Sequence, residues 1–251
     1  MRLLSWNVNG LRAVLRSDAL RWVFESGAYD VICLQEVKMN PQALQELPDF
    51  HRGYEVYWSL ADKPGYSGVA TFTRIKPEGV FRQLGEPSKI VEGEGRVVGL
   101  QFGPLMLINA YFPNSQPDHA RLDVKLDFCD KMLRVVNGAA YRGESVVLTG
   151  DVNIAHKEND LANPQANKNA SGFLPEERAW LDTFLAGPCH DGFRQFEQSG
   201  GHYTWWSYRA GVRERNIGWR IDYVLGNVQF NAVLHHPDKM GSDHCPVSAL
   251  W

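Results

Sequence analysis

The chain has 251 residues, 44% of them hydrophobic, and a formal net charge of -3. The mild negative charge excludes a protein that holds nucleic acid through basic charge over its whole surface, although a local basic face is still compatible with it. The length and the hydrophobic fraction suffice for the core of one large α/β domain or of two small ones.

The cysteines and the apolar runs bear on the cellular compartment. The four cysteines are isolated and form no CxxC pair, which argues against a zinc knuckle or a redox motif and fits a reducing compartment. The chain opens without the apolar core of a signal peptide. No apolar run approaches the roughly 20 residues that a membrane span needs. We therefore expect a cytoplasmic protein with no membrane association.

In the N-terminal half, short apolar runs alternate with turn residues. Ser17 and Asp18 can cap a helix whose apolar residues follow at helical spacing, and Gly27 would end it. A second, short helix is expected near residues 41–47. Strands are expected at 2–8, 30–36, 55–59, 69–73, 97–102 and 105–111, the last two forming a hairpin.

The C-terminal half continues the alternation of helices and strands. Residues 121–136 have a clear apolar helical face, and a further helix begins at Pro175 with acidic residues in its first turn. Residues 159–172 are rich in asparagine and predict a long surface loop. Further strands are expected at 145–149, 203–206, 220–225, 229–234 and 245–250. Since no repeat or linker interrupts the chain, we predict a single domain over residues 1–251.

The segment that begins at Ser145 suggests where the chemistry lies. Val146 to Leu148 form an apolar run that predicts a strand buried on both faces, and Asp151 and Asn153 follow directly after Gly150. On this segment alone an ordinary turn is the simpler explanation of these residue types. The alternative is a sheet that presents a carboxylate and an amide to a cleft.

Other predicted strands end in the same kind of polar residue. In an α/β sheet such ends gather on one side, where a ligand cleft forms. Carboxylates, amides, a phenol and an imidazole suit a hard cation such as Mg²⁺ or Mn²⁺ and the hydrolysis of a phosphodiester. Asp222 lies inside an apolar strand and needs a partner, for which His244 is the natural candidate. The set comprises Asn7, Asn9, Glu36, Tyr111, Asn114, Asp151, Asn153, Asp222, Asp243 and His244.

Six motifs together resemble the exonuclease III / AP endonuclease family, which belongs to the endonuclease–exonuclease–phosphatase superfamily. They stand in the family's order between residues 5 and 246, so the resemblance covers nearly the whole chain. The motifs are SWNVNGLR at 5–12, LQEVK at 34–38, NAYFPN at 109–114, GDVN at 150–153, WRIDY at 219–223 and SDHCP at 242–246.

The resemblance implies an α/β fold, a four-layered α/β sandwich in which two mixed sheets pack face to face with helices outside. It also implies roles for the polar residues. Glu36 would be the principal metal ligand, with Asp243 and Asn9 at or near the metal. Asp151 would activate the attacking water, with Asn7 holding it. Asn153, Tyr111 and Asn114 would contact or lie beside the scissile phosphate. His244 would stabilise its negative charge, and Asp222 would orient His244.

The activity implied is a Mg²⁺-dependent cleavage of double-stranded DNA on the 5′ side of abasic sites, leaving a 3′-hydroxyl and a 5′-deoxyribose phosphate. Mn²⁺ could replace Mg²⁺, and 3′→5′ exonuclease and 3′-phosphodiesterase activities could accompany the cleavage. Some relatives have aspartate at the position of Asn9, so we expect one metal ion at a time here. Residues 115–119 contain no arginine that aligns with the one some relatives insert into DNA.

Aromatic residues and arginines interleave over 203–209 and 213–220 and predict DNA contact, since arginines bind phosphates while flat rings pack a flipped sugar. A core-edge aromatic cluster with solvated arginines is the alternative. Arg209 belongs to this segment. The resemblance singles out Trp205 and Trp219 for the abasic-sugar pocket and places Asn167 in a DNA-contact loop.

Three other functions stay open at this point. The enzyme could be predominantly a 3′→5′ exodeoxyribonuclease of the same family. It could be a superfamily member that hydrolyses phosphoinositides, sphingomyelin or RNA tails, although such enzymes lack the WRIDY segment. It could also be a non-catalytic module that binds damaged DNA. We expect the protein to be a monomer.

Overall fold

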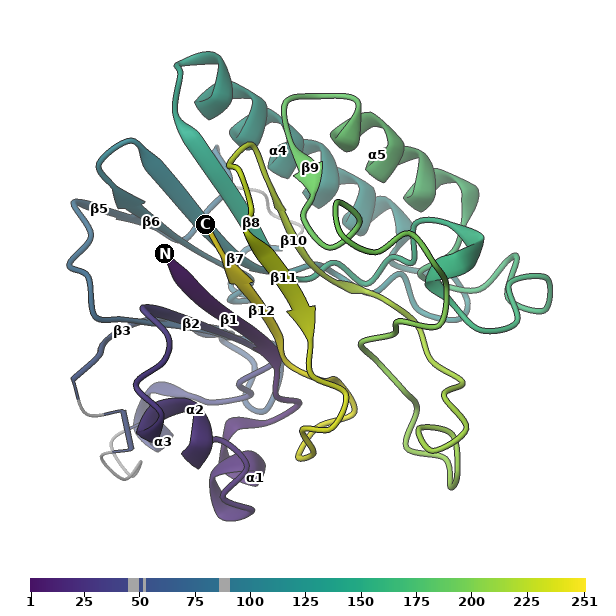
Figure 1. The fold of residues 1–251 in the computed structure, drawn as a ribbon, viewed down its shortest axis with the longest axis horizontal. Helices are drawn as coiled ribbons and strands as arrows, with labels where there is room; N and C mark the ends of the chain where they lie inside the picture. The colour runs from purple at the N-terminus through teal and green to yellow at the C-terminus, as the bar shows by residue number, and fades with distance from the viewer. Residues whose placement is uncertain (45–49, 52, 86–90) are drawn as a thin grey trace.

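Two six-stranded sheets pack face to face in the computed structural model, which describes residues 1–44, 50–51, 53–85 and 91–251. Helices α1 to α3 lie outside one sheet, and helices α4 and α5 lie outside the other (Figure 1). The four-layered α/β sandwich predicted from the sequence is therefore confirmed. No helix in the described ranges is both long and apolar enough to cross a membrane.

The first sheet contains the N-terminal strands and the C-terminal strands. Its order is β11-β12-β1-β2-β4-β3, and only β1 and β2 pair in parallel among these neighbours. Its outer face packs against α1 and α2 through a core that includes Trp6 and Phe72. The strands are β1 (Arg2–Asn7), β2 (Val31–Gln35), β3 (Glu55–Ser59), β4 (Val69–Thr73), β11 (Ala232–His235) and β12 (Val247–Leu250).

The second sheet is built from the middle of the chain in the order β5-β6-β7-β8-β10-β9, with β7 and β8 in parallel. At its centre β7 and β8 approach so closely that a Cβ at Gly150 would lie 2.0 Å from the carbonyl oxygen of Ala110. Only glycine fits there. The strands are β5 (Gly79–Phe81), β6 (Val97–Phe102), β7 (Leu105–Tyr111), β8 (Ser145–Asp151), β9 (His190–Asp191) and β10 (Asp222–Gly226).

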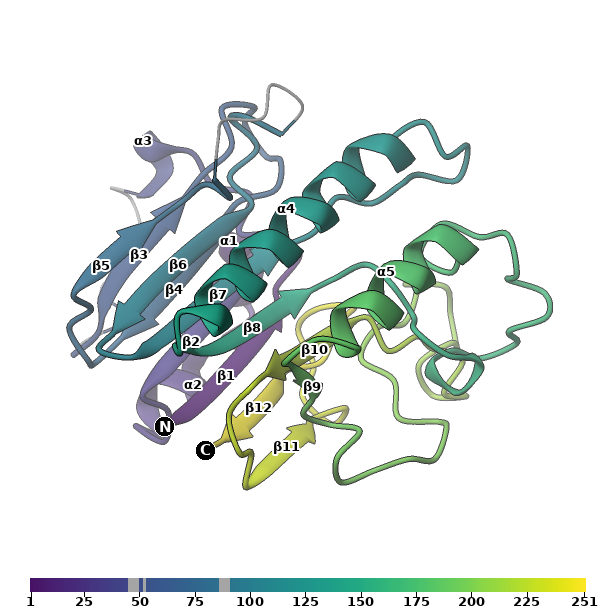
Figure 2. The ribbon, with the colours of Figure 1, turned by 90° about the horizontal axis from the view of Figure 1, so that it is seen from above.

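The helices follow the apolar faces read from the sequence. Helix α4 buries Phe128, Met132 and Val136 against the second sheet, with α5 beside it (Figure 2). Pro175 stands at the first turn of α5, where its missing N–H costs no hydrogen bond. The helices are α1 (Leu11–Arg16), α2 (Arg21–Glu25), α3 (Pro41–Leu44), α4 (Leu122–Tyr141) and α5 (Pro175–Leu185), with a 3₁₀ turn at Glu158–Asp160.

Several predicted elements need correction. Ser17 follows α1, which was not predicted, and neither Ser17 nor Asp18 caps α2. Residues 203–206 form isolated bridges from Trp205 to Trp219 and to His244 instead of a strand. The strands predicted at 229–234 and 245–250 begin two to three residues later, at Ala232 and Val247. Residues 45–47 of the predicted short helix lie outside the described residues.

Both parallel strand pairs end at the same end of the sandwich. Asn7 and Gln35 are opposite each other at the ends of β1 and β2, and Tyr111 and Asp151 are opposite each other at the ends of β7 and β8. A buried hydrogen bond of 2.8 Å from Gln35 Nε2 to Asn109 Oδ1 joins the two sheets just behind this end. The polar strand ends from both sheets therefore meet.

Candidate active site

A pocket of about 520 Å³ opens at the end of the sandwich where the polar strand ends meet. Seven of its lining residues lie at strand ends or in the turns next to them, and the other seven come from the loops 114–117, 170–172 and 205–219. The lining residues are Glu36, Tyr111, Asn114, Pro117, Asp151, Asn153, Ala170, Ser171, Gly172, Trp205, Trp219, Ile221, Asp243 and His244.

Glu36, Asp151 and His244 form the centre of the pocket, where one ligand atom of each lies within 4.8 Å of those of the other two. Asn7 at the end of β1 ties the two carboxylates together, because its Nδ2 donates to Glu36 Oε1 at 2.9 Å and to Asp151 Oδ2 at 2.8 Å. Segments separated by more than 200 residues thus converge on one point.

Glu36 is turned toward the pocket by an uncommon backbone. Its φ of 49° lies in the left-handed region, which residues with long side chains rarely adopt and which is enriched at functional sites. Its carboxylate pairs with the ammonium of Lys38 at 2.9 Å. Burial opposes the charge of Glu36, but Lys38 and Asn7 outweigh it and hold the pKa of Glu36 below its usual value. Glu36 is therefore an anion at neutral pH.

Asp151 is 1% exposed and is held by donors on both oxygens. The backbone N–H of Asn153 donates to its Oδ1 at 2.8 Å, and Asn7 donates to its Oδ2. Burial raises the pKa of Asp151 well above that of an ordinary aspartate, and the nearby Glu36 carboxylate adds to this effect, while His244 opposes it. The group is thus a stronger base than an exposed carboxylate once it is ionised.

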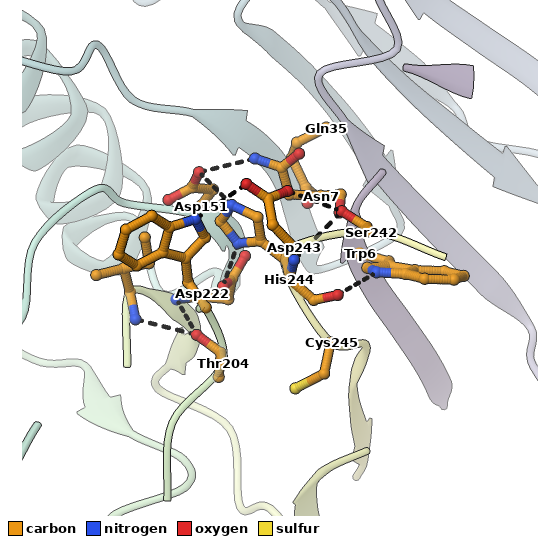
Figure 3. Close-up of polar contacts among 12 residues, drawn as sticks. Trp6, Asn7, Gln35, Asp151, Thr204, Asp222, Ser242, Asp243, His244 and Cys245 are labelled. Atoms are coloured by element: carbon orange, nitrogen blue, oxygen red, sulfur yellow. Dashed lines mark hydrogen bonds and ion pairs between the residues drawn. The ribbon is translucent and has the colours of Figure 1, made fainter. Parts of the chain in front are cut away.

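His244 lies between two aspartates (Figure 3). Its Nδ1 donates to Asp222 Oδ2 at 2.8 Å, and its Nε2 lies 3.8 Å from Asp151 Oδ2. Burial favours neutral imidazole, but the carboxylates of Asp222 and Asp151 outweigh it and raise the pKa of His244 above its usual value. His244 therefore presents a positively charged N–H to the pocket.

Two contacts hold the Asp222–His244 pair in place. The hydroxyl of Thr204 accepts the backbone N–H groups of Ile221 and Asp222, each at 3.1 Å, at the start of β10. The indole of Trp6 donates to the carbonyl oxygen of His244 at 3.0 Å (Figure 3). Because these partners are buried, the imidazole orientation is fixed before any ligand arrives.

Asn9 and Asp243 form a second polar group next to Glu36. Asn9 Nδ2 donates to Asp243 Oδ1 at 3.0 Å, and Lys38 donates to Asn9 Oδ1. The indole of Trp205 donates to Asp243 Oδ2 at 3.1 Å. One lysine thus contacts both Glu36 and Asn9, which links this group to the central carboxylates.

Amides and a phenol form the amide wall of the pocket, next to Glu36 and Asp151. Asn114 Nδ2 donates to Asn153 Oδ1 at 3.1 Å, and Ser171 Oγ donates to Asn114 Oδ1 at 3.0 Å. Burial, with the charges of Glu36 and Asp151, raises the pKa of Tyr111 well above that of an ordinary tyrosine. The phenol therefore keeps its proton at neutral pH, and this wall consists of neutral polar groups, among which Asn153 Nδ2 donates to the carbonyl oxygen of Phe112 at 3.0 Å.

Two tryptophans form the apolar side of the pocket. The rings of Trp205 and Trp219 meet edge to face with centroids 6.4 Å apart, and Phe173 packs edge-on against Trp219 at 6.3 Å. Ile221 lies beside them. This side can receive a flat or apolar group next to the charged centre.

Twelve of the fourteen predicted site residues contribute to the pocket or contact its lining directly, Asn7 and Asn9 through hydrogen bonds and Asp222 through His244. Asn167 and Arg209 are not brought there. Asn167 donates to the carbonyl oxygens of Ala162 and Asn163 within its own loop, and Arg209 lies on an exposed loop. The predicted roles stay predictions.

Several residues at the pocket were missed by sequence reasoning. Lys38 stands two residues after Glu36, and that spacing was the available signal. Ile221 stands in the WRIDY motif, and Ser171 and Gly172 lie at the end of the predicted surface loop 159–172. Neither pattern shows that these residues reach the pocket, which depends on contacts such as those of Ser171 with Asn114 and of Gly172 with Glu177.

The central cluster fits a hard divalent cation. Glu36 and Asp151 supply carboxylate oxygens that face each other across a water-accessible pocket, and Mg²⁺ and Mn²⁺ prefer such donors. His244 is a poor ligand while its Nε2 carries a proton. The metal ligands predicted from the sequence are Glu36, Asn9 and Asp243. Glu36 lies in the central cluster with Asp151, while Asn9 and Asp243 hydrogen-bond to each other next to that cluster.

Comparisons with known proteins agree with this geometry. A family model described as the Endonuclease/Exonuclease/phosphatase family matches residues 4–244. The chain is 41% identical to an exodeoxyribonuclease of Bacillus subtilis over 100% of this chain and 99% of that protein. It is 36% identical to the DNA repair nuclease APEX1 of Danio rerio, over 99% of this chain and 81% of that protein. The crystal structure of an AP endonuclease from Leishmania major superposes with a TM-score of 0.87 at 30% identity, covering 99% of this chain and 86% of that one.

Proposed function

The chain belongs to the endonuclease/exonuclease/phosphatase family, and we propose that this hydrolytic nuclease cleaves the DNA backbone on the 5′ side of abasic sites. The convergence of Glu36, Asp151 and His244 beside a tryptophan-lined recess carries the proposal. Phosphodiester hydrolysis needs a base for water, positive charge for the phosphate and a pocket for the neighbouring sugar. All three lie within one cavity.

Asp151 activates the water in this proposal. Its pKa is raised by burial, and its Oδ2 lies toward the pocket within 3.8 Å of His244 Nε2. Asn7 and the N–H of Asn153 fix the carboxylate, so that proton transfer needs no reorientation. Asp151 Oδ2, which would accept the proton, is therefore close enough to His244 to activate a water next to a phosphate that His244 binds.

The phosphate is held by donors on two sides. His244 presents a charged N–H, oriented by Asp222, which stabilises negative charge that develops on the phosphate oxygens. Tyr111, Asn114 and Asn153 add neutral hydrogen-bonding groups from the amide wall. In this proposal Asp151 is the base, His244 is the charged hydrogen-bond donor, and the neutral groups orient the phosphate.

Glu36 would hold the metal ion. Asp151 lies in the same cluster as Glu36, and Asp243 lines the same pocket. A bound Mg²⁺ or Mn²⁺ would supply positive charge that neutralises the phosphate and the leaving oxygen. Asn9 is neutral and is engaged by Lys38 and Asp243, so we propose a single ion at a time.

The same site could remove nucleotides from 3′ ends, and the relatives include an enzyme named exodeoxyribonuclease. One assay compares the two activities: a duplex with one abasic analogue is incubated with Mg²⁺ or with chelator, beside an intact duplex with recessed 3′ ends. Cleavage 5′ to the analogue with Mg²⁺ alone supports the proposal. Shortening of the recessed ends without cleavage at the analogue would assign the exonuclease instead.

The pH dependence of kcat/KM tests the roles of Asp151 and His244. Because the pKa of Asp151 is raised, the base is lost on acidification at a higher pH than for an ordinary aspartate, whose pKa is about 3.9. Because the pKa of His244 is raised, its charge persists above the usual value of about 6.5. Asp222→Asn removes the carboxylate that raises the pKa of His244, so we expect the alkaline limb of the profile to move to lower pH. An unchanged alkaline limb would contradict the proposed Asp222–His244 pair.

Trp219 provides a test of the sugar recess. Trp219→Ala is expected to raise KM for abasic DNA by about 10- to 100-fold, since an apolar contact in a pocket discriminates by such factors, with less effect on shortening of 3′ ends. Trp22 is also half-buried but packs against Tyr29 and His236, away from the pocket, so Trp22→Ala is the matched control. Equal losses in the two variants would remove the recess from substrate recognition.

The remaining proposals concern organisation. We propose that residues 1–251 form a single catalytic domain that acts as a monomer in the cytoplasm, on double-stranded DNA. Size-exclusion chromatography with light scattering, with and without an abasic duplex, tests the oligomeric state.

A further inference from the structure

Behind the amide wall of the pocket lies an ion pair that the proposed mechanism does not use. Lys125 in α4 and Glu177 in α5 are both 0% exposed, and Lys125 Nζ lies 2.7 Å from Glu177 Oε1. A buried ion pair is expensive to desolvate, and an apolar pair of similar volume often stabilises a helix contact as well or better. Glu177 also caps the start of α5, because its Oε2 accepts the backbone N–H of Leu174 at 3.0 Å, but that cap does not require a buried lysine beside it.

Both charged groups are also bonded to segments that line the pocket. Lys125 Nζ donates to the carbonyl oxygen of Asn153 at 2.7 Å. Glu177 Oε1 accepts the hydroxyl of Ser115 at 2.7 Å, and its Oε2 accepts the backbone N–H of Gly172 at 2.7 Å. The pair thus reaches the segments that follow β7 and β8 and the loop before α5.

These segments carry the donors of the amide wall. Ser115 follows Asn114 directly, and its hydroxyl lies 2.7 Å from that of Ser171, which can donate to Asn114 Oδ1. Asn114 in turn donates to Asn153. Ser115 gives its only proton to Glu177, so the single proton of Ser171 goes either to Ser115 or to Asn114 Oδ1. Glu177 thus holds the residue next to Asn114 and the loop of Ser171, while Lys125 holds the backbone of Asn153.

Asn153 needs such support because of its backbone. Its φ of 56° is left-handed, a conformation that costs energy even though asparagine tolerates it better than most residues. Gly172 packs so closely on it that an added Cβ would lie 2.9 Å from the carbonyl oxygen that Lys125 binds. Lys125 holds this carbonyl from behind, which aims the Asn153 side chain at the pocket.

We propose that Lys125 and Glu177 are positioning residues for the phosphate-binding wall: they fix the backbone of Asn153 and, through Ser115 and Ser171, the side chain of Asn114. The inference rests on the proposed function for what the wall binds. Neither residue lines the pocket, and both act through the asparagines.

The test compares three variants. Lys125→Met alone leaves the Glu177 carboxylate buried without its partner and will lower stability, so Lys125→Met with Glu177→Gln is the main variant, because it removes both charges. Lys125→Arg keeps the charge and the donor and is the conservative variant. Val136→Ala lies on the same helix, is also buried, and leaves a cavity in the core that packs against the second sheet, away from the pocket; it is the stability-matched control.

We expect the double variant to lower kcat by about 10- to 100-fold, as small displacements of positioning groups do, with KM changed by less than about threefold. Lys125→Arg should recover most of kcat, and Val136→Ala should keep it at temperatures where all variants are folded. A double variant with wild-type kcat, or a kcat loss in Val136→Ala equal to that in the double variant, would overturn the inference.

A second readout separates this inference from the proposed function. The side-chain amide resonances of Asn114 and Asn153, assigned by NMR in the protein without DNA, should shift and broaden in the double variant and stay in place in Val136→Ala. If wild type fails to cut abasic DNA but these shifts occur, the proposed function fails and the positioning role stands. If wild type cuts and the resonances do not move, the positioning role fails.

Discussion

Replacing Asp151 with asparagine is expected to lower kcat for cleavage of abasic DNA by about 10²- to 10⁴-fold, the range that a general base contributes. Asparagine has nearly the same shape but cannot take a proton from water. It also places an amide where Asn7 and the N–H of Asn153 both donate to a carboxylate, so one of these donors loses its acceptor. Affinity for DNA should fall much less than the rate.

The measurement is single-turnover cleavage of an abasic duplex with saturating Mg²⁺, together with binding of the same duplex by fluorescence anisotropy. Asp130→Asn makes the same chemical change on an exposed face of α4 and should keep wild-type rates. If Asp151→Asn cleaves at more than about a tenth of the wild-type rate, the loss is smaller than removal of a general base would cause. The water must then be activated by another group.

Replacing Glu36 with glutamine is expected to weaken binding of Mg²⁺ or Mn²⁺ by more than about tenfold and to reduce cleavage at fixed metal concentration by at least as much. The carboxylate faces Asp151 at the centre of the pocket, and its negative charge is maintained by Lys38 and Asn7. Glutamine removes the charge but keeps the size, so the loss would report on ion binding and not on packing.

Calorimetric titration with Mn²⁺ measures the affinity directly and without catalysis, and raising the metal concentration should recover part of the rate. Glu78→Gln removes a carboxylate from an exposed turn and is the matched control. An unchanged affinity for Mn²⁺ in Glu36→Gln would move the ion to the neighbouring Asp243 and Asn9, which the sequence also indicated as metal ligands. Loss of cleavage with unchanged affinity would give Glu36 a different role.

Much of the fold could be read from local patterns. The strands at 55–59, 69–73, 97–102 and 105–111 were predicted with the bounds that the structure has, because turn residues on both sides of a short apolar run fix where the strand begins and ends. The bounds were wrong where a segment depends on distant partners. Residues 203–206 make bridges to Trp219 and His244, and no pattern within the segment indicates these.

The site shows the same division. The identities of Glu36, Asp151 and His244 follow from polar residues at strand ends and from the resemblance of six motifs to a nuclease family. The buried ion pair of Lys125 and Glu177 could not be predicted, because each residue reads as a solvated charge on an amphipathic helix until the helices are packed together. Asn167 hydrogen-bonds within its own loop, and its predicted contact with DNA stays a prediction.

The amino-acid sequence by itself determined which chemical groups this nuclease has and at which strand ends they stand, since periodicity and motif order are local properties of the chain. Only the tertiary structure decided the distances between them, the burial that raises the pKa of Asp151, and the two aspartates that keep His244 charged. Those quantities depend on which of two sheets each strand joins and on how closely the sheets pack, so they arise only when residues far apart in the chain, such as Asn7, Asp151 and His244, are brought into contact.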